Sequence, residues 1–170
     1  MAKYANIFGL GEKTNFIFNE KDGLIPTNQW KLKNKGQRWW PGETLSAAIG
    51  QSFLLVTPLQ IAKMIASIHN GYLTKPRILE DAPIQQQPLE ISKDTRAFLK
   101  SSMKLGVKEG TGQRLKDIEN LTIYAKTGSA QTSKLSKREL GLQYREHGWF
   151  VANFRYKDQN PLTLVILVET

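Results

Sequence analysis

The clearest pattern of hydrophobic and polar positions predicts a helix at residues 58–70. Its apolar side chains recur every three or four positions, as one face of a helix requires: Ile61, Met64, Ile65 and Ile68. Thr57 is a suitable N-cap, and Pro58 fits the first helical position, where its missing N–H costs nothing. Gly71 can adopt the left-handed conformation that ends a helix. We expect this apolar face, Met64 included, to lie in the core.

A second helix is predicted from the candidate N-cap Ser92 to about Val107, and the glycine-rich segment 110–112 ends it. Between the two helices, residues 72–91 contain several prolines and a run of glutamines. We therefore expect extended, loop-like chain there.

The first 40 residues show weaker patterns. Tyr4, Ile7 and Phe8 can form one side of a short helix that ends at the glycines following it. Residues 15–18 indicate a short strand. We expect the rest of this segment to be irregular and rich in turns.

From residue 121 onward the pattern predicts β structure. Strands are expected at residues 121–125, 148–156 and 162–169. Turn residues at 158–161 make the last two strands an antiparallel hairpin. Residues 162–168 are apolar on both faces, so we expect a central, covered strand. The charged segment 133–146 is predicted to be a mobile loop, and the whole pattern predicts an α+β fold.

Length and composition set the outer limits. A chain of 170 residues usually forms one domain, and 40% hydrophobic and 23% charged residues are ordinary values for a globular protein. No cysteine is present, so disulfides are excluded. No stretch approaches the roughly 18 consecutive apolar residues of a membrane span, and the first residues lack the apolar core of a signal peptide. Taken by itself, the chain is expected to have no means of leaving the cytoplasm.

The formal net charge of +9 favours anionic partners in general. The cations form two modest clusters: Lys31, Lys33, Lys35 and Arg38, and Lys134, Lys137 and Arg138. We expect each cluster to be a solvated face. A nucleic-acid surface requires basic residues interleaved with stacking aromatic rings, and Trp39 and Trp40 beside Arg38 are the only hint of that.

The most informative residues for function are Lys126, Thr127 and Gly128, which follow the apolar run 121–125. A strand with these residues in succession presents a cation, a hydroxyl donor and unshielded backbone side by side. That combination suits a substrate with a carboxylate next to a reactive carbonyl, and it is one signature of penicillin-binding and β-lactamase enzymes. The tripeptide alone is weak evidence, because about one shuffled sequence in ten would contain it.

Further motifs stand in one order along the chain: Ile49-Gly50-Gln51, Thr57-Pro58-Leu59-Gln60-Ile61-Ala62, Asn70-Gly71, Pro76, Gly110-Thr111-Gly112, Ala125-Lys126-Thr127-Gly128-Ser129-Ala130-Gln131 and His147-Gly148-Trp149-Phe150. This series resembles the C-terminal part of the transpeptidase domain of class B penicillin-binding proteins, of the penicillin-binding protein 2 type. The resemblance covers nearly the whole chain. It implies that residues 1–170 are the C-terminal portion of such a domain, a partial penicillin-binding/β-lactamase-like fold with helices packed on antiparallel strands.

In this family a serine hydroxyl attacks the D-Ala–D-Ala peptide bond, and an amine of a neighbouring stem peptide resolves the acyl-enzyme. The resemblance implies catalytic roles for Lys126, which would attract the terminal carboxylate, and for Ser129, whose N–H would be one of two oxyanion donors. Thr127 would donate its hydroxyl to the same carboxylate, and Gly128 would let extended substrate lie against bare backbone. The substrate-binding residues are thus Lys126, Thr127, Gly128 and Ser129. No cofactor and no metal is implied.

The family's S-x-x-K motif, with its nucleophilic serine, and its S-x-N motif lie upstream of the segment that this chain matches. No S-x-N occurs in the chain. One S-x-x-K does occur, Ser101 to Lys104, but about one such match is expected by chance, and the family has a packed helix at this place. We therefore expect Met103 to anchor that helix in the core, and the chain to be a fragment that is inactive alone.

Three positions depart from the family's pattern. Ser52 and Asn15 stand where a glycine is common, and Tyr72 stands where a small residue often follows Asn70-Gly71. These departures concern turns more than chemistry.

Neither histidine is assigned a catalytic role. His147 opens a predicted strand and has no acidic residue at triad or metal-ligand spacing. His69, near the end of the first predicted helix, fits a favourable position in the helix dipole and is interpreted as structural. Gln51 and Thr57-Pro58 are interpreted as scaffold.

The resemblance implies a piece of a peptidoglycan D,D-transpeptidase. Once completed by the upstream half, its partners would be the D-Ala–D-Ala stem peptide, β-lactams and other proteins of cell-wall elongation. A full-length family member works at the extracytoplasmic face of the cell membrane, although this chain carries no signal or anchor. Two alternatives remain open, a non-catalytic basic binding module and a nucleic-acid binder that uses the positive charge, but we do not expect nucleic acid as the partner.

Overall fold

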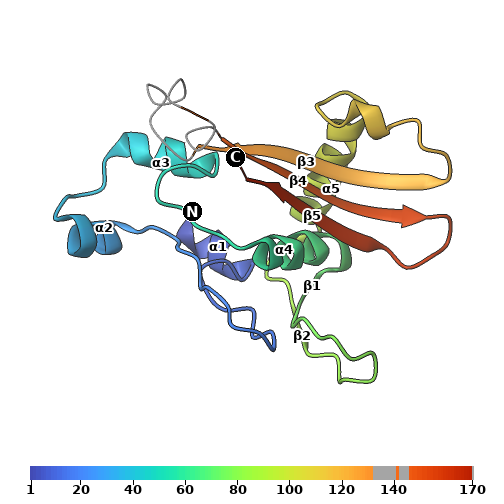
Figure 1. The fold of residues 1–170 in the computed structure, drawn as a ribbon, viewed down its shortest axis with the longest axis horizontal. Helices are drawn as coiled ribbons and strands as arrows, with labels where there is room; N and C mark the ends of the chain where they lie inside the picture. Colours follow the sequence, from blue (N-terminus) through green and yellow to red (C-terminus); the bar gives the residue numbers. More distant parts are fainter. Residues whose placement is uncertain (132–140, 142–145, 170) are drawn as a thin grey trace.

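The computed structural model describes residues 1–131, 141 and 146–169. Its main sheet within these residues has three antiparallel strands in the order β3-β4-β5: β3 (Leu121–Ala130), β4 (His147–Tyr156) and β5 (Leu162–Val168) (Figure 1). The ladder pairs Lys126 with Val151, and Val151 in turn with Val165. The predicted α+β class and the hairpin between the last two strands are confirmed.

Two long helices pack against this sheet, mainly on one of its faces. α4 (Pro58–Asn70) contacts β4 and β5, and α5 (Lys93–Lys108) contacts β3 (Figure 1). Their apolar faces meet the sheet in a buried cluster of Ile65, Ile68, Met103 and Val151. Met64 packs against this cluster, so the core positions predicted for Met64 and Met103 are confirmed.

Both helices begin and end where their capping residues predict. Thr57 Oγ1 accepts a hydrogen bond from the N–H of Gln60 at 3.2 Å, and Gly71 ends α4 in the left-handed conformation at φ 87°. At the start of α5, Ser92 Oγ accepts a hydrogen bond from the N–H of Thr95 at 3.0 Å.

The N-terminal segment contains more helix than its sequence pattern predicts. The short helix α1 (Ala2–Ile7) is confirmed, but α2 (Asn28–Lys35) contradicts the expectation of irregular chain, and no pattern predicts α3 (Pro41–Ala48). Hydrophobic periodicity misses α2 because its buried residue is a lysine, Lys31, which is 2% exposed. The strand predicted at residues 15–18 is wrong, because the chain bends there and exposes Ile17 and Phe18.

Shorter elements complete the described chain. The stretch predicted as extended, residues 72–91, contains the two-stranded antiparallel sheet of β1 (Tyr72–Thr74) and β2 (Gln86–Pro88), with β1 against α4. A 3-10 turn, η1 (Gln113–Leu115), leads into β3. The loop predicted at residues 133–146 lies outside the described residues, apart from Gly141 and Glu146.

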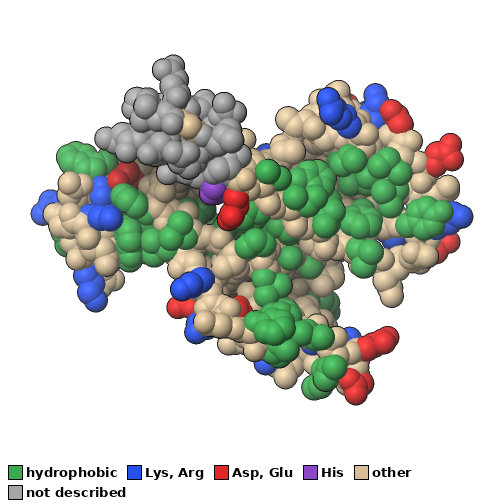
Figure 2. All heavy atoms as spheres, in the orientation of Figure 1, with side chains coloured by type: hydrophobic (Ala, Val, Ile, Leu, Met, Phe, Trp, Pro, Cys, Tyr) green, Lys and Arg blue, Asp and Glu red, His purple; other side chains and the backbone are tan. Residues whose placement is uncertain are grey.

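The prediction of a central, covered strand at residues 162–168 is wrong. Within the described residues β5 pairs only with β4, so it lies at the end of the sheet. Its side chains alternate between the helix-covered face and an open face, and four apolar side chains on the open face are 42–60% exposed: Leu162, Leu164, Ile166 and Val168. Figure 2 shows hydrophobic side chains gathered over this part of the sheet. A strand that is apolar on both faces requires a layer on each face. α4 covers β5 on one face, whereas on the other face the described helices reach the sheet near β3, where Val107 of α5 packs with Ile123, Ala125 and Ala152.

Gln60 ties the N-terminal segment to α4. Its side chain is almost completely buried, at 1% exposure. The carboxamide Nε2 donates hydrogen bonds to the carbonyls of Glu12 at 2.7 Å and Asp22 at 2.8 Å, and Oε1 accepts one from the N–H of Thr57 at 2.9 Å. One carboxamide thus satisfies three backbone groups from segments far apart in the sequence.

We predict that Gln60→Leu, which keeps the size of the side chain and removes these bonds, lowers the free energy of unfolding by about 2–4 kcal/mol, because buried backbone groups lose their partners. Urea unfolding of the dilute protein measures the change. Gln29→Leu, at an exposed position in the first turn of α2, is the matched control and should change stability by less than about 0.5 kcal/mol. Equal unfolding curves for the two variants would contradict the role assigned to Gln60.

Candidate active-site strand

The four site residues predicted from the sequence lie in succession on β3. Lys126, Gly128 and Ser129 are exposed, and Thr127 is half-buried. One edge of β3 pairs with β4 over ten residue pairs, from Leu121–Tyr156 to Ala130–His147. Within the described residues no strand pairs with the other edge, which we call the open edge of β3.

The side chains of Lys126 and Thr127 leave β3 on opposite faces, because successive side chains of a strand alternate. Lys126 shares the face of Val151, which belongs to the core cluster under the helices, and Thr127 shares the face of Phe150. The ammonium of Lys126 donates a hydrogen bond to the carbonyl of Thr127. The structure therefore brings the cation and the hydroxyl close along the strand, but a ligand that meets both must approach at the open edge.

Thr127 has a partner that the sequence did not suggest. Its hydroxyl lies 2.6 Å from the hydroxyl of Thr111, and either oxygen can be the donor. Thr111 is held there by its two glycine neighbours: a Cβ on Gly110 would lie 2.8 Å from the carbonyl oxygen of Gly106 in α5, and the N–H of Gly112 donates to that same oxygen at 3.1 Å. In the sequence, only the motif Gly110-Thr111-Gly112 pointed to this contact. The structural role of the motif is to place Thr111 against β3.

Gly128 is not required by the packing of the described chain. A Cβ at this position would meet only the Cβ of Trp149, at 3.6 Å, which is ordinary van der Waals contact. Its backbone also stays outside the left-handed region that favours glycine. The missing side chain therefore leaves an exposed stretch of backbone without serving the local fold, and bare backbone of this kind admits close approach by another chain.

Gln51 binds the open edge of β3, although the sequence suggested only a scaffold role. Its Nε2 donates to the carbonyl of Ser129 at 2.9 Å, and its Oε1 accepts from the N–H of Gln131 at 3.2 Å. This carboxamide therefore imitates one residue of a neighbouring strand. Because the N–H and C=O of one strand residue point to the same side, the N–H of Ser129 is also directed to the open edge.

The turn that presents Gln51 is strained. Gly50 and Ser52, on either side of Gln51, both have positive φ, 81° and 71°. Ser52 is one of the positions where the resembled family has a glycine, and Asn15, the other such position, also has a positive φ, 61°. Asparagine tolerates this region far better than serine does, so the strain falls mainly on Ser52.

Three cations of the first basic cluster, Lys33, Lys35 and Arg38, are exposed as expected, but Lys31 departs from the solvated face. Lys31 is buried, and its Nζ lies 2.6 Å from Glu43 Oε1 and donates to the carbonyl of Arg38 at 3.0 Å. The bonds from Lys31 and from the N–H of Trp40 lower the pKa of Glu43 from its ordinary value. Lys31 thus joins α2 to α3 and is removed from any nucleic-acid surface. The second cluster, Lys134, Lys137 and Arg138, lies outside the described residues.

The histidines and Ser101 add nothing to the candidate strand. His147 begins β4 opposite Ala130. His69 lies in the last turn of α4, as expected, but burial, followed by the charges of Lys100 and Arg96, lowers its pKa to about 4, which opposes the charged form that the helix dipole would favour. Ser101 donates to the carbonyl of Phe98 within α5. Among the described residues, no cluster of three or more histidine, cysteine, aspartate or glutamate side chains could hold a metal ion.

An unpaired β edge that carries a cation, a hydroxyl and a bare glycine has the features of edges to which an extended peptide can add as a further strand. The sequence profile of the family described as penicillin binding protein transpeptidase domain matches residues 1–170. The chain belongs to this family, and within it to the penicillin-binding protein 2 type.

The individual relatives agree with this assignment. The peptidoglycan D,D-transpeptidase MrdA of Salmonella typhimurium is 28% identical over 95% of this chain and 29% of its own length. Stage V sporulation protein D of Bacillus subtilis is 28% identical over 98% of this chain and 25% of its own length. The penicillin-binding protein PBP2 of Helicobacter pylori, solved in complex with MreC, superposes with a TM-score of 0.86 and 31% identity over 99% of this chain and 31% of its own.

The chain thus spans less than a third of the length of these relatives. Among the described residues no helix combines the length and the apolar character that crossing a bilayer would need.

We predict that Ser52→Gly stabilises the protein by about 1 kcal/mol, because glycine adopts the positive φ without the penalty that serine suffers. Thermal unfolding measures the change. Ser46→Gly, inside α3, is the matched control and should destabilise, because glycine is a poor helix former. A Ser52→Gly protein that melts below the parent would contradict the strain argument.

A second prediction concerns Gln51→Leu, which removes both bonds to the open edge. Amide hydrogen exchange in residues 129–131 should rise by roughly threefold to tenfold, since each neutral hydrogen bond contributes about 0.5–1.5 kcal/mol. Mass spectrometry of exchanged peptides measures the rate. Gln37→Leu, at an exposed position between α2 and α3, should leave the exchange unchanged. If Gln51→Leu also leaves it unchanged, Gln51 does not hold this edge.

Proposed function

We propose that residues 1–170 are the C-terminal portion of a transpeptidase domain and supply one wall of a serine-type D,D-transpeptidase site. The observation that carries this proposal is the open edge of β3, where the N–H of Ser129 is directed outward beside the exposed Gly128. The peptidoglycan D,D-transpeptidases among the relatives support the reaction class.

The reaction is an acyl transfer. A serine from the preceding part of the domain attacks the carbonyl carbon between the two D-Ala residues of a stem peptide, the peptide C–N bond breaks, and the terminal D-Ala leaves with a proton. An amine of a second stem peptide then attacks the ester and releases the serine.

Each residue of the wall has a role at the substrate. The ammonium of Lys126 attracts the terminal carboxylate and keeps nearby bases deprotonated. The hydroxyl of Thr127 hydrogen-bonds the same carboxylate, and its contact with Thr111 fixes the oxygen in place. The N–H of Ser129 stabilises the oxyanion, a contribution of roughly 2.7–4 kcal/mol for one such donor. Gly128 permits the substrate backbone to lie against the strand.

Gln51 and a bound substrate would share one hydrogen-bond acceptor. An extended substrate that pairs with the open edge uses the carbonyl of Ser129, which already accepts a hydrogen bond from Gln51. A carbonyl oxygen has two lone pairs, so both bonds can coexist. Gln51 therefore holds the acceptor in place from one side while the substrate approaches from the other.

The proposal extends to partners and place. The PBP2 of Helicobacter pylori was solved in complex with MreC, and another similar structure, 31% identical, belongs to a peptidoglycan synthase complex. We propose that the complete protein works with cell-wall elongation proteins at the outer face of the cell membrane, and that it binds β-lactams as analogues of D-Ala–D-Ala.

Labelling with a fluorescent penicillin tests the function. We predict no covalent adduct on this chain alone, and an adduct on a longer polypeptide that includes the preceding part of the domain. In that polypeptide Lys126→Ala should slow acylation by roughly 100-fold, in the range of other lost electrostatic contacts to the reacting group. Lys157→Ala, an exposed lysine just after β4, is the control and should react at the parent rate.

Two results would overturn the proposal. One is an adduct on Ser101 in the chain alone, because that would place the nucleophile in α5. The other is a longer polypeptide that labels equally fast with and without Lys126.

A further inference from the structure

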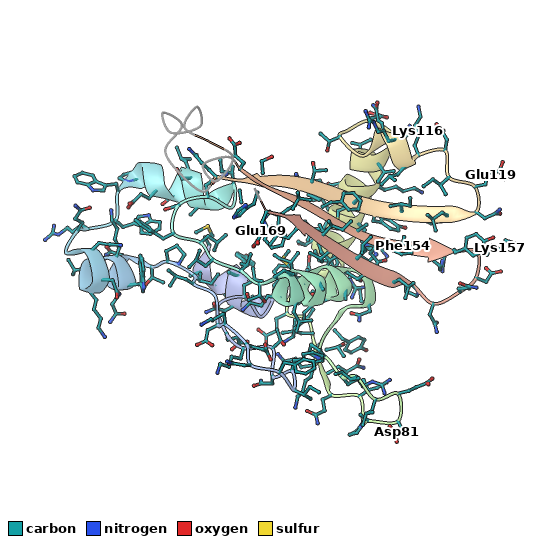
Figure 3. All side chains as sticks on the ribbon, viewed as in Figure 1. Asp81, Lys116, Glu119, Phe154, Lys157 and Glu169 are labelled. Atoms are coloured by element: carbon teal, nitrogen blue, oxygen red, sulfur yellow. The ribbon has the colours of Figure 1, made fainter. Side chains whose placement is uncertain are left out.

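A cavity lies apart from the candidate strand residues. It has a volume of about 290 Å³ and is formed by the C-terminal turn of α4, the middle of α5 and the opposite end of the β sheet. Figure 3 marks this end of the sheet with Phe154 on β4, Lys157 just after β4 and Glu119 before β3. The side chains with polar groups that line the cavity are His69, Asn70, Lys100, Thr122, Tyr124, Asn153, Arg155 and Thr163.

The charge of this cavity is positive and uncompensated. Lys100 and Arg155 line it, and no carboxylate does so among the described residues. Neither cation forms an ion pair with another described side chain. Burial first, and then the charges of Lys100 and Arg96, lower the pKa of His69 to about 4, so this ring adds no charge to the cavity at neutral pH.

Hydrogen-bond donors also converge on the cavity. Asn153 is 5% exposed, and its Nδ2 donates to Thr163 Oγ1 at 3.0 Å. Because that oxygen already accepts a bond, the hydroxyl hydrogen of Thr163 can be donated to another group. The ring of His69 packs edge-on against Tyr124, with centroids 4.6 Å apart, and its buried Nε2 has no hydrogen-bond partner among the described residues. The ring is therefore not anchored through that nitrogen.

We propose that this cavity binds a small oxyanion, a carboxylate or a phosphate group. Two cations, a hydroxyl and an amide, without a carboxylate, favour an acceptor-only ligand with a negative charge. A cavity of about 290 Å³ has room for such a group together with several waters. Lys100 lies 5.7 Å from the centre of the Tyr124 ring, which positions its ammonium over the cavity wall. The proposal is independent of the transpeptidase function, because none of the strand residues Lys126 to Ser129 lines this cavity.

Nuclear magnetic resonance of the ¹⁵N-labelled chain tests the proposal. Sodium acetate and sodium phosphate are titrated against sodium chloride of equal ionic strength, and the signals of the Asn153 side-chain amide and the Thr163 backbone amide are followed. We expect saturable shifts with acetate, phosphate or both, and none with chloride. Saturation by acetate alone identifies a carboxylate ligand, and saturation by phosphate alone identifies a phosphate-bearing one.

Variants separate a built site from general charge attraction. Lys100→Met and Arg155→Met should each weaken binding at least tenfold. Lys104→Met, on the next turn of α5 and outside the cavity, should leave it unchanged. The proposal is overturned if neither anion gives saturable shifts, if chloride shifts the same signals equally, or if Lys104→Met weakens binding as much as Lys100→Met does.

Discussion

The antiparallel pairing of β3 with β4 is the constraint on which the candidate site depends. Its ten consecutive residue pairs fix the register of β3 without interruption. This register directs Lys126 to the helix-covered face, Thr127 to the opposite face and the peptide groups of Ser129 to the open edge. A slip of one residue would exchange the two faces and turn the N–H of Ser129 toward β4. The geometry of the site is therefore a property of the ladder, and no single side chain determines it.

The strongest elements could be predicted from the sequence because their signals are local. The helix at 58–70 has a regular apolar face, an N-cap and a glycine stop, and all of these are within a few residues of one another. The tripeptide from Lys126 to Gly128 could be placed on a strand because an apolar run precedes it. In both cases hydrogen bonding and burial act in the same segment that carries the pattern.

The errors come from information that is not local. Gln51 contacts Ser129 across 78 residues, and no pattern around Gln51 records that contact. From the sequence alone Lys31 is expected at the surface, because its partner Glu43 is 12 residues away and nothing near Lys31 indicates the ion pair. Both faces of β5 are apolar, as its sequence shows. Whether a second layer covers the strand depends on which other segments pack against it, and the sequence of β5 does not contain that information. Periodicity shows which side chains of a segment favour burial, and the tertiary structure determines whether other segments bury them.

The open face of β5 links folding to association. Leu162, Leu164, Ile166 and Val168 remain in contact with water in the described structure, so any polypeptide layer that covers them gains the free energy of removing that apolar area from solvent. Such a gain appears only in the folded sheet, because the unfolded strand does not present these four side chains together. A polypeptide that covers this face binds only the native state. The midpoint of thermal unfolding therefore rises with the concentration of that polypeptide, as it does for any ligand of the native state.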